Sequence, residues 1–248
     1  MRTGIMGAMP EEVDIIREQM TEVSEVKHGS RTYYQGKINN AEVVLVFCRW
    51  GKGAAATTAT SLIDKFNADQ LIFTGVAGAV SSDLNIGDIV ISSELYQHDL
   101  DPSPLFPKHE VPLTGLTFFK ADSVLIQKAE AASKALLSNL EMTISPESLE
   151  EFHIKEPKCY TGVIASGDQF VSSKERTETI LREQPQALAV EMEGALLAQV
   201  CHDHKLPFVV IRTISDKADH EAHIDFPKFI EEIARRYSES IVKYMFAH

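Results

Sequence analysis

The chain has 248 residues, of which 44% are hydrophobic and 24% are charged, and its formal net charge is −12. These values are ordinary for a globular protein of one large domain, and the acidic balance argues against a duplex nucleic-acid binder, which needs a basic face. The three cysteines, Cys48, Cys159 and Cys201, are widely spaced and odd in number, so the sequence indicates neither a disulfide framework nor a zinc ribbon.

The sequence predicts neither a targeting segment nor a membrane span. The N-terminal stretch MRTGIMGAMPEE has too short an apolar run for a signal peptide. No stretch of the chain approaches the roughly 20 apolar residues that a membrane-spanning helix needs. We therefore expect a cytoplasmic protein without a membrane partner.

Strands and helices alternate along the first half of the chain. A short apolar strand from Gly4 to Ala8 precedes Pro10, which suits the first turn of a helix because its missing N–H costs nothing there. The small residues Gly75 to Ala79 resemble a loop that follows a strand. The other predicted elements are strands at 24–28, 32–37, 42–47, 70–74 and 87–92 and a helix at 54–66.

The second half begins with a proline-rich stretch, residues 99–119, which predicts a long ordered loop. Residues 141–158 are acidic without a clear period and predict a surface excursion. Val190 to Gly194 are expected to open a helix, and Asp225 is expected to cap the N-terminus of the last helix. The other predicted elements are helices at 121–137 and 174–183, strands at 158–165 and 206–211, and the last helix to about Met245.

This alternation predicts the fold class. Strands that alternate with helices favour a three-layer α/β/α sandwich with a central mixed sheet. No repeat, low-complexity tract or linker divides the chain, so residues 1–248 are expected to form a single domain. Several strands end abruptly in small or polar residues (GAMPEE, TGVAGA, SGDQF, TISD), which predicts one site above one edge of the sheet.

Three carboxylates are the candidates for chemistry at this edge: Glu12, Glu193 and Asp216. Glu191 and Glu193 are two positions apart, so they cannot share a helix face, and only one of them is expected to point at the site. Carboxylates around a sugar suit cleavage of a glycosidic bond, in which one protonates the leaving group and another activates water. A carboxylic acid can also protonate a purine ring nitrogen if burial raises its pKa.

Other chemistries fit the residues less well. The pairs His202/His204 and His220/His223 lack a third ligand, so we expect no metal. Lys52 follows Gly51, but the full phosphate-loop pattern is absent. The sequence therefore favours acid–base catalysis without a cofactor.

Six motifs give the chain a specific resemblance. GIMGAMPEEV, FTGVAGA, QHDLD, IASGDQFV, AVEMEGA and VIRTISD occur in the order seen in 5′-methylthioadenosine/S-adenosylhomocysteine nucleosidases, which belong to the nucleoside phosphorylase superfamily. The resemblance covers nearly the whole chain. It implies a nucleoside-phosphorylase-like fold and hydrolysis of the adenine–ribose bond of methylthioadenosine, S-adenosylhomocysteine and 5′-deoxyadenosine, with no metal or cofactor.

The resemblance also implies roles for individual residues. Glu12 resembles the group that activates water, Glu193 the carboxylate that holds the ribose hydroxyls, and Asp216 the acid that protonates adenine N7. Phe170 resembles the ring that stacks on the purine, and the backbone of Val171 resembles the group that reads the adenine edge. Further expected contacts are Met192 against the sugar, Ser215 beside the acid, Arg212 as a support for the carboxylates, and Met9, Val76 and Trp50 in the substrate pocket.

Members of this family are homodimers, so the resemblance implies that Pro102, Leu105 and Phe106 reach the alkylthio pocket of the neighbouring subunit. Two departures bear on this pocket: Val76 stands where many members have Ser, and Trp50 stands where a smaller aliphatic residue is common. They leave the 5′-substituent open, including 6-amino-6-deoxyfutalosine as an alternative substrate. A phosphate-dependent phosphorylase and a nucleoside-binding module without activity are the competing interpretations.

Overall fold

The computed structural model describes residues 1–218 and 226–247. Its strands are β1 (Arg2–Gly7), β2 (Thr21–His28), β3 (Arg31–Ile38), β4 (Ala41–Phe47), β5 (Gln70–Ala79), β6 (Ile89–Gln97), β7 (Phe119–Lys120), β8 (Cys159–Ser166), β9 (Ala187–Glu191) and β10 (Phe208–Asp216). Its helices are α1 (Pro10–Glu18), α2 (Lys52–Asp64), α3 (Ser123–Leu137), α4 (Leu140–Thr143), α5 (Pro146–Glu151), α6 (Lys174–Glu183), α7 (Gly194–Asp203), α8 (Phe226–Phe229) and α9 (Arg235–Met245), with a π-helical turn, Ile230–Ala234, between α8 and α9.

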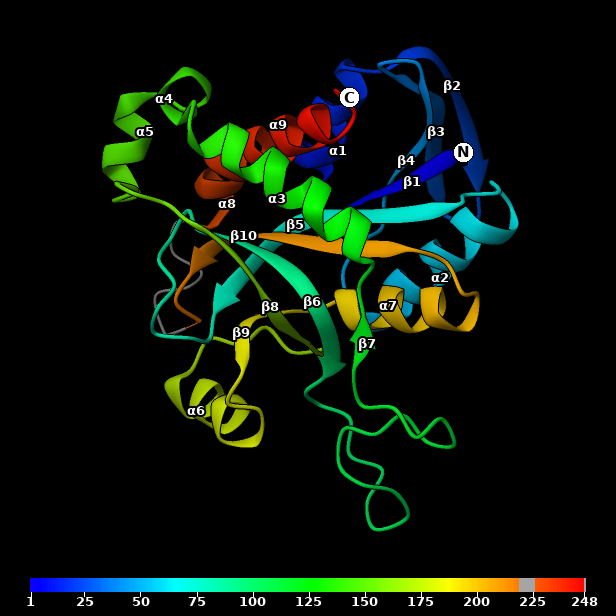
Figure 1. The fold of residues 1–248 in the computed structure, drawn as a ribbon, viewed down its shortest axis with the longest axis vertical. Helices are drawn as coiled ribbons and strands as arrows, with labels where there is room; N and C mark the ends of the chain where they lie inside the picture. Colours follow the sequence, from blue (N-terminus) through cyan, green and yellow to red (C-terminus); the bar gives the residue numbers. More distant parts are fainter. Residues whose placement is uncertain (219–225, 248) are drawn as a thin grey trace.

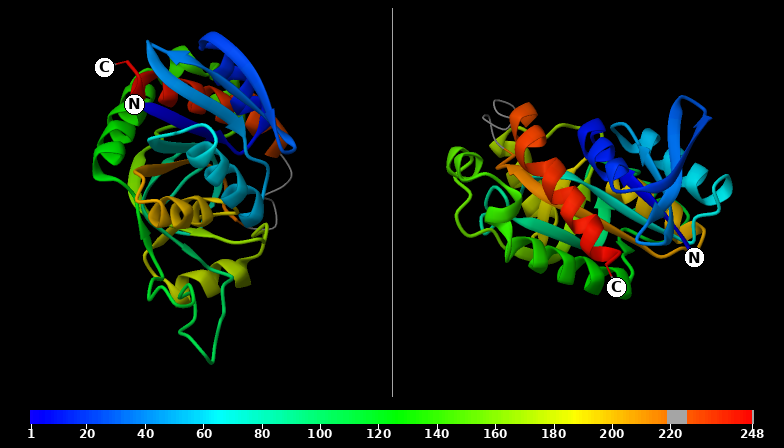
Figure 2. Two further views of the ribbon diagram at one scale, coloured as in Figure 1. Left: turned by 90° about the vertical axis from the view of Figure 1, so that its right-hand side faces the viewer. Right: turned by 90° about the horizontal axis from the view of Figure 1, so that it is seen from above.

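The strands form one mixed sheet that closes on itself at one end (Figure 1). β5 pairs in parallel with β1 and β10 and antiparallel with β9. β9 continues through β8 and β6 back to β10, so five strands complete a circuit. β1, β4, β3 and β2 extend the sheet outward from β5, and Figure 2 shows the β2–β3 hairpin at the opposite end of the molecule from α6.

Helices cover both faces of the sheet, as the fold prediction requires (Figure 1). α1, α3 and α9 lie on one face, and α2 and α7 lie on the other. The side chains of β10 alternate between these layers: Val209 and Ile211 pack with the α3–α9 cluster, whereas Phe208 and Val210 pack with the α2–α7 cluster. This burial on both faces explains the near-continuous apolar run of the strand. The predicted three-layer α/β/α class with a mixed sheet is confirmed.

The first helix begins as its sequence predicts. Pro10 occupies the first turn of α1, and Met9 is the N-cap residue. The backbone N–H of Met9 donates to Glu12 Oε2 at 3.1 Å, so the Glu12 side chain reaches back over the helix start as in a capping box. This local motif fixes the carboxylate at the carboxyl end of β1.

Two segments differ from the predicted elements. Val190 and Glu191 do not open a helix: they end the strand β9, and α7 begins only at Gly194. Residues Gly75 to Ala79 are not a loop but the continuation of β5. Strand pairing overrides the local signal in both cases, because Gly75 to Ala79 pair with β10 and β9, and Val190 and Glu191 pair with β8.

The surface excursion also has more structure than predicted, because residues 141–158 contain most of α4 and all of α5. The predicted long loop at 99–119 projects from the end of β6 (Figure 1). The predicted N-cap, Asp225, lies outside the described residues. Among the helices that the structure describes, none is long and apolar enough to cross a membrane.

Candidate active site

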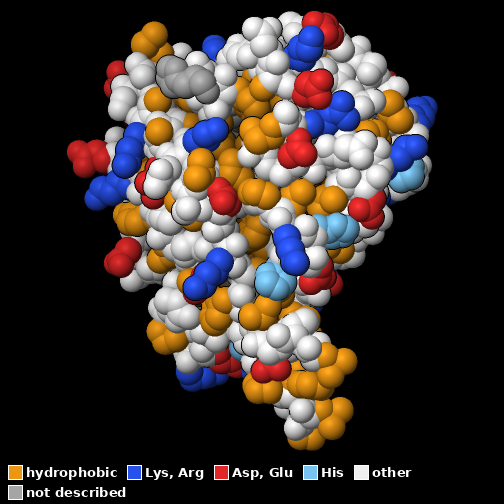
Figure 3. All heavy atoms as spheres, turned by 45° about the vertical axis from the view of Figure 1, so that its right-hand side comes forward, with side chains coloured by type: hydrophobic (Ala, Val, Ile, Leu, Met, Phe, Trp, Pro, Cys, Tyr) orange, Lys and Arg blue, Asp and Glu red, His pale blue; other side chains and the backbone are white. Residues whose placement is uncertain are grey.

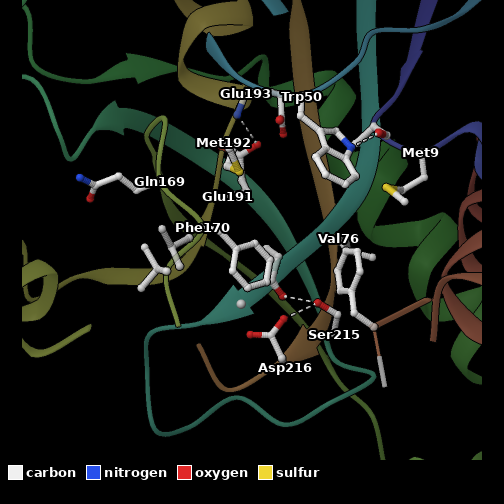
Figure 4. Close-up of a pocket in the computed structure, with 16 residues that line it drawn as sticks. Met9, Trp50, Val76, Gln169, Phe170, Glu191, Met192, Glu193, Ser215 and Asp216 are labelled. Atoms are coloured by element: carbon white, nitrogen blue, oxygen red, sulfur yellow. Dashed lines mark hydrogen bonds between the residues drawn. The ribbon is translucent and has the colours of Figure 1, made fainter. Parts of the chain in front are cut away.

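A cavity opens where the carboxyl ends of several strands meet (Figure 4). The empty space inside it, with the open solvent at its mouth included, is about 630 Å³. Most of its lining residues lie at or just after the ends of strands. The lining residues are Ala8 and Met9 after β1, Trp50 after β4, Val76 to Gly78 in β5, Gln169 to Val171 after β8, Val190 to Glu193 around the end of β9, Ser215 and Asp216 in β10, and Phe226 at the start of α8.

Asp216 ends β10 and is the carboxylate at one end of this cavity (Figure 4). Its Oδ2 accepts from the Ser215 hydroxyl at 2.7 Å, and its Oδ1 accepts from the backbone N–H of Ala218 at 2.7 Å. A Cβ atom on Gly78 would lie 2.9 Å from Asp216 Oδ1. β5 therefore needs glycine at this position to let the carboxylate approach.

Glu193 lies at the opposite end of the cavity, as the N-cap residue of α7 (Figure 4). Its Oε1 accepts from the backbone N–H of Gly51 at 2.7 Å. Burial raises the pKa of Glu193 to about 7, and the nearby charge of Glu191 adds to this rise, while Arg212 opposes it. Glu193 is therefore a buried acceptor that titrates near neutral pH.

Glu191 has a structural role, as the sequence predicts for one of the two neighbouring carboxylates. Its Oε2 accepts from Arg212 Nη2 at 2.6 Å, and both of its oxygens accept from the backbone N–H of Gly194. The Ser166 hydroxyl also donates to Glu191 Oε1. The guanidinium of Arg212 is fully buried and lies 4.1 Å from the centroid of the Phe73 ring. This ion pair fixes the turn that presents Glu193.

Glu12 is buried behind the cavity wall formed by Ala8 and Met9 and does not itself line the cavity. Its Oε1 accepts from the Ser238 hydroxyl at 2.7 Å, and its Oε2 accepts from the N–H of Met9. Burial raises the pKa of Glu12 to about 7, while the hydrogen bond from Ser238 and the charge of Arg212 lower it. A carboxylate with such a pKa can accept a proton at neutral pH.

Aromatic side chains form much of the remaining wall. Phe170 is about half exposed, and its ring lies edge-on to that of Phe226, with 6.2 Å between their centroids. The Trp50 indole N–H donates to the carbonyl of Ala8 at 3.0 Å, which fixes the indole at the mouth of the cavity (Figure 4). A cavity with apolar walls and a few carboxylates suits a flat heterocycle attached to a polar ring.

Comparison with known proteins identifies the family. A model of the phosphorylase superfamily matches residues 2–247. A 5′-methylthioadenosine/S-adenosylhomocysteine nucleosidase from Staphylococcus haemolyticus (strain JCSC1435) is 36% identical over 244 residues, which are 97% of this chain and 98% of that protein. The chain belongs to this nucleosidase family of the phosphorylase superfamily.

Solved structures show the same fold. The 5′-methylthioadenosine/S-adenosylhomocysteine nucleosidase from Neisseria meningitidis, in complex with methylthio-immucillin-A, superposes with a TM-score of 0.86 at 33% identity, over 98% of this chain and 97% of that chain. The futalosine hydrolase of Helicobacter pylori strain 26695 superposes with a TM-score of 0.81 at 35% identity, over 98% and 96% of the two chains. Both neighbours extend over nearly the full length of this nucleosidase-family chain.

The cavity brings together most of the residues that the family resemblance selects. The predicted site residues that line it are Met9, Trp50, Val76, Phe170, Val171, Met192, Glu193, Ser215 and Asp216. Glu12 and Arg212 are buried outside this lining. Pro102, Leu105 and Phe106 lie on the projecting loop after β6 and do not line the cavity of their own chain.

Sequence reasoning missed Phe226, Gln169 and Ser238. Phe226 lines the cavity, but its apolar spacing indicates only a core position. Ser238 carries a weak signal, because it is a polar residue on the apolar face of α9 between Tyr237 and Ile241. The signal becomes specific only when the packing of α9 on α1 is known.

Of the two histidine pairs, one lies away from the cavity and the other lies outside the described residues. His202 is in the last turn of α7 and His204 is its C-cap residue, whereas His220 and His223 fall in the part of the chain that is not described. Within residues 1–218 and 226–247, no group of three or more His, Cys, Asp or Glu side chains could hold a metal ion.

Proposed function

We propose that this protein hydrolyses the N-glycosidic bond of 5′-methylthioadenosine and S-adenosylhomocysteine, and also of 5′-deoxyadenosine, to release adenine. The observation that carries the proposal is the pair of carboxylates, Glu193 and Asp216, at opposite ends of one cavity with aromatic walls. The family of the chain supports the same reaction.

The adenine end of the substrate would lie against Asp216. Protonation of N7 makes adenine a neutral leaving group, and Asp216 is the acid that would deliver this proton. The Ser215 hydroxyl donates to its Oδ2 and would hold the carboxyl group in position. Phe170 would stack on the purine, and the backbone of Val171 would pair with the edge of the base.

The ribose would lie against Glu193 and Met192, with its hydroxyl groups donating to the Glu193 carboxylate. Departure of adenine leaves an oxocarbenium-like sugar, which water attacks at the anomeric carbon. Glu12 would take the proton from this water, and its pKa of about 7 suits a general base at neutral pH. Arg212 would act from behind the wall by balancing the charge of the buried carboxylates.

Phosphorolysis is the competing reaction of the superfamily, and the cavity supports it poorly. A phosphate co-substrate needs Arg or Lys donors. The described residues that line the cavity include two Glu and one Asp but neither Arg nor Lys. The carboxylates would repel a phosphate dianion, whereas a water molecule meets no such penalty.

Hydrolysis of 6-amino-6-deoxyfutalosine is a second candidate function. The similarity to a futalosine hydrolase favours it, and so do the apolar side chains Val76 and Trp50 in the cavity wall. This substrate has the same adenine–ribose bond, so the chemistry is unchanged and only the 5′-substituent differs.

We also propose that the protein is a homodimer in which Pro102, Leu105 and Phe106 complete the partner's cavity. Leu105 is 83% exposed in the single chain. Figure 3 shows hydrophobic side chains gathered on the projecting segment, where a second chain would cover them. The mass of the protein in solution, measured by light scattering, tests the dimer.

Adenine release from 5′-methylthioadenosine in phosphate-free buffer tests the reaction. We expect equal release with and without phosphate, and a loss of roughly 100-fold or more in Glu12→Gln. Glu11→Gln is the matched control, because it removes the neighbouring carboxylate of the same helix turn and should retain activity. Release that requires phosphate, or full activity of Glu12→Gln, would overturn the proposal.

A further inference from the structure

Glu12 lies at the end of a chain of two buried hydroxyl groups that are hydrogen-bonded in series. The reaction proposed above gives neither hydroxyl a role. The Ser238 hydroxyl lies 2.7 Å from Glu12 Oε1, and the Thr74 hydroxyl lies 2.7 Å from that of Ser238. These three side chains come from α1, α9 and β5, and each is at most 2% exposed. Tertiary packing therefore brings Ser238, 226 positions away in the sequence, to the Glu12 carboxylate.

The hydrogens in this chain have one arrangement when Glu12 is ionised. A carboxylate can only accept, so Ser238 must donate its single hydroxyl hydrogen to Glu12. Ser238 then has only acceptor capacity left, and Thr74 must donate to it. Successive donors strengthen one another, so Thr74 makes Ser238 a better donor to the carboxylate.

We propose that Ser238, with Thr74 behind it, is a positioning residue that keeps Glu12 ionised and oriented as the base that activates water. The proposal rests on the proposed hydrolysis and on the role of Glu12 in it. Neither hydroxyl lines the cavity, so both would act through the carboxylate and not on the substrate.

The geometry around the chain is held independently of the substrate. Gln19 Nε2, one residue beyond α1, donates to the carbonyl of Glu239, which adjoins Ser238 in α9. The N–H of Met9 fixes the second oxygen of Glu12. The carboxylate is therefore oriented by backbone donors just before its own helix, at Ala8 and Met9, and by one hydroxyl from α9.

Other charged groups around Glu12 are accounted for. Arg212 of β10 is the charged side chain that acts on Glu12, and it pairs with Glu191. The charged groups of α9 near Ser238 belong to surface pairs: Arg235 pairs with Glu231 of the π-helical turn, and Arg236 pairs with Glu239. Glu193 titrates in the same pH range as Glu12. Because the Ser238 hydroxyl donates to Glu12, its removal should change the pH dependence of the step that uses Glu12.

The test is the pH dependence of kcat/KM for adenine release from 5′-methylthioadenosine in Ser238→Ala. Loss of the donor favours the neutral form of Glu12, so the acid limb should move to higher pH by about one unit. The variant should then be roughly tenfold slower than the wild type near pH 6 and nearly equal to it above about pH 8.5. Thr74→Val should shift the limb in the same direction by less, and Ser238→Thr should restore it.

Ser240→Ala is the matched control, because it makes the same change two residues further along α9 and should leave the acid limb in place. If Ser238→Ala does not fold, Thr74→Val carries the test. A purely structural role of Ser238 would lower Tm without moving the acid limb of the pH profile. An acid limb of Ser238→Ala that coincides with that of the wild type would overturn this proposal alone. The same outcome in Thr74→Val would overturn it where that variant carries the test. A wild type that releases no adenine, or an active Glu12→Gln, would instead overturn the proposed function.

Discussion

Glu12 should make the protein less stable as the pH rises, and Glu12→Gln should remove this dependence. The side chain is fully buried, and its pKa in the folded protein is about 7, against the ordinary value of 4.5 that the unfolded chain retains. Below about pH 4.5 the carboxyl is neutral in both states and costs nothing. As the pH rises from about 4.5 to about 7, the unfolded chain ionises while the folded carboxyl stays largely protonated, so folding becomes less favourable; above about pH 7 both states are ionised and the loss is complete.

The size of the effect follows from the difference between these two pKa values. At about 1.4 kcal/mol for each pKa unit, the difference between 4.5 and about 7 amounts to about 3 kcal/mol of unfolding free energy above pH 7. In a protein of 248 residues, about 3 kcal/mol corresponds to roughly 6 to 12 °C in Tm. Gln fits the site, because Ser238 can reverse its hydroxyl and accept from the new amide while it donates to Thr74.

Calorimetric Tm values for wild type and Glu12→Gln, measured at intervals from about pH 5 to pH 8.5, test this reasoning. The Tm of the variant relative to that of the wild type should increase as the pH rises, by roughly 6 to 12 °C in total. Glu193 is present in both proteins, so its own titration largely cancels in the comparison. Parallel Tm curves would refute the reasoning, because they would mean that ionisation of Glu12 has no cost in the folded state.

Three further changes test the site. Asp216→Asn should retain the fold, measured by circular dichroism, and lose roughly 100-fold or more in kcat for adenine release, because it removes the proposed acid. Arg212→Met leaves the buried Glu191 carboxylate without its cation and should lower the unfolding free energy in urea by about 3 to 5 kcal/mol, and Glu191→Gln in the same protein should restore part of it. Phe170→Ala should weaken binding of adenine, measured by titration calorimetry, by about 1 to 3 kcal/mol, because it removes the ring on which the purine would stack. Unchanged affinity would exclude stacking.

The sequence predicts most of the fold because most strands here have a strong local signal. β4 and the first half of β10, Phe208–Ile211, are largely apolar runs, and α6 spans the residues predicted for it, although β10 continues past its predicted end at residue 211 to Asp216. β9 ends in Val190 and Glu191, which were wrongly expected to open a helix because the Ala and Leu residues that follow Gly194 favour one. Its strand conformation comes from pairing with β8 and β5, which are distant in sequence.

The end of β5 is a second segment whose conformation the local sequence does not predict. Gly75 and Gly78 predict a loop, because glycine weakens a strand. A Cβ on Gly75 would lie 2.9 Å from Arg212 Nη1, so glycine is present to admit the guanidinium and not to form a turn. Only the packing of β10 against β5 reveals this requirement.

The site was predictable where its residues follow strand ends. Asp216 and Glu193 could be selected in this way, since the carboxyl ends of strands meet at one edge. Ser238 could not be selected, because its contact with Glu12 spans 226 residues and depends on how α9 packs against α1. Local patterns identify groups that face a site, whereas the groups that support them are chosen by tertiary packing.

The electrostatics of the site link its activity to its stability. Arg212 is one buried cation near three buried carboxylates, Glu191, Glu12 and Glu193, and it is paired directly with Glu191. The other two carboxylates therefore bear most of the cost of burial, and both have a pKa of about 7. That value suits the proposed role of Glu12 as a base at neutral pH, but it also means that ionising Glu12 destabilises the fold. A Glu12→Gln protein that is both inactive and more stable at high pH is the joint result that this arrangement requires.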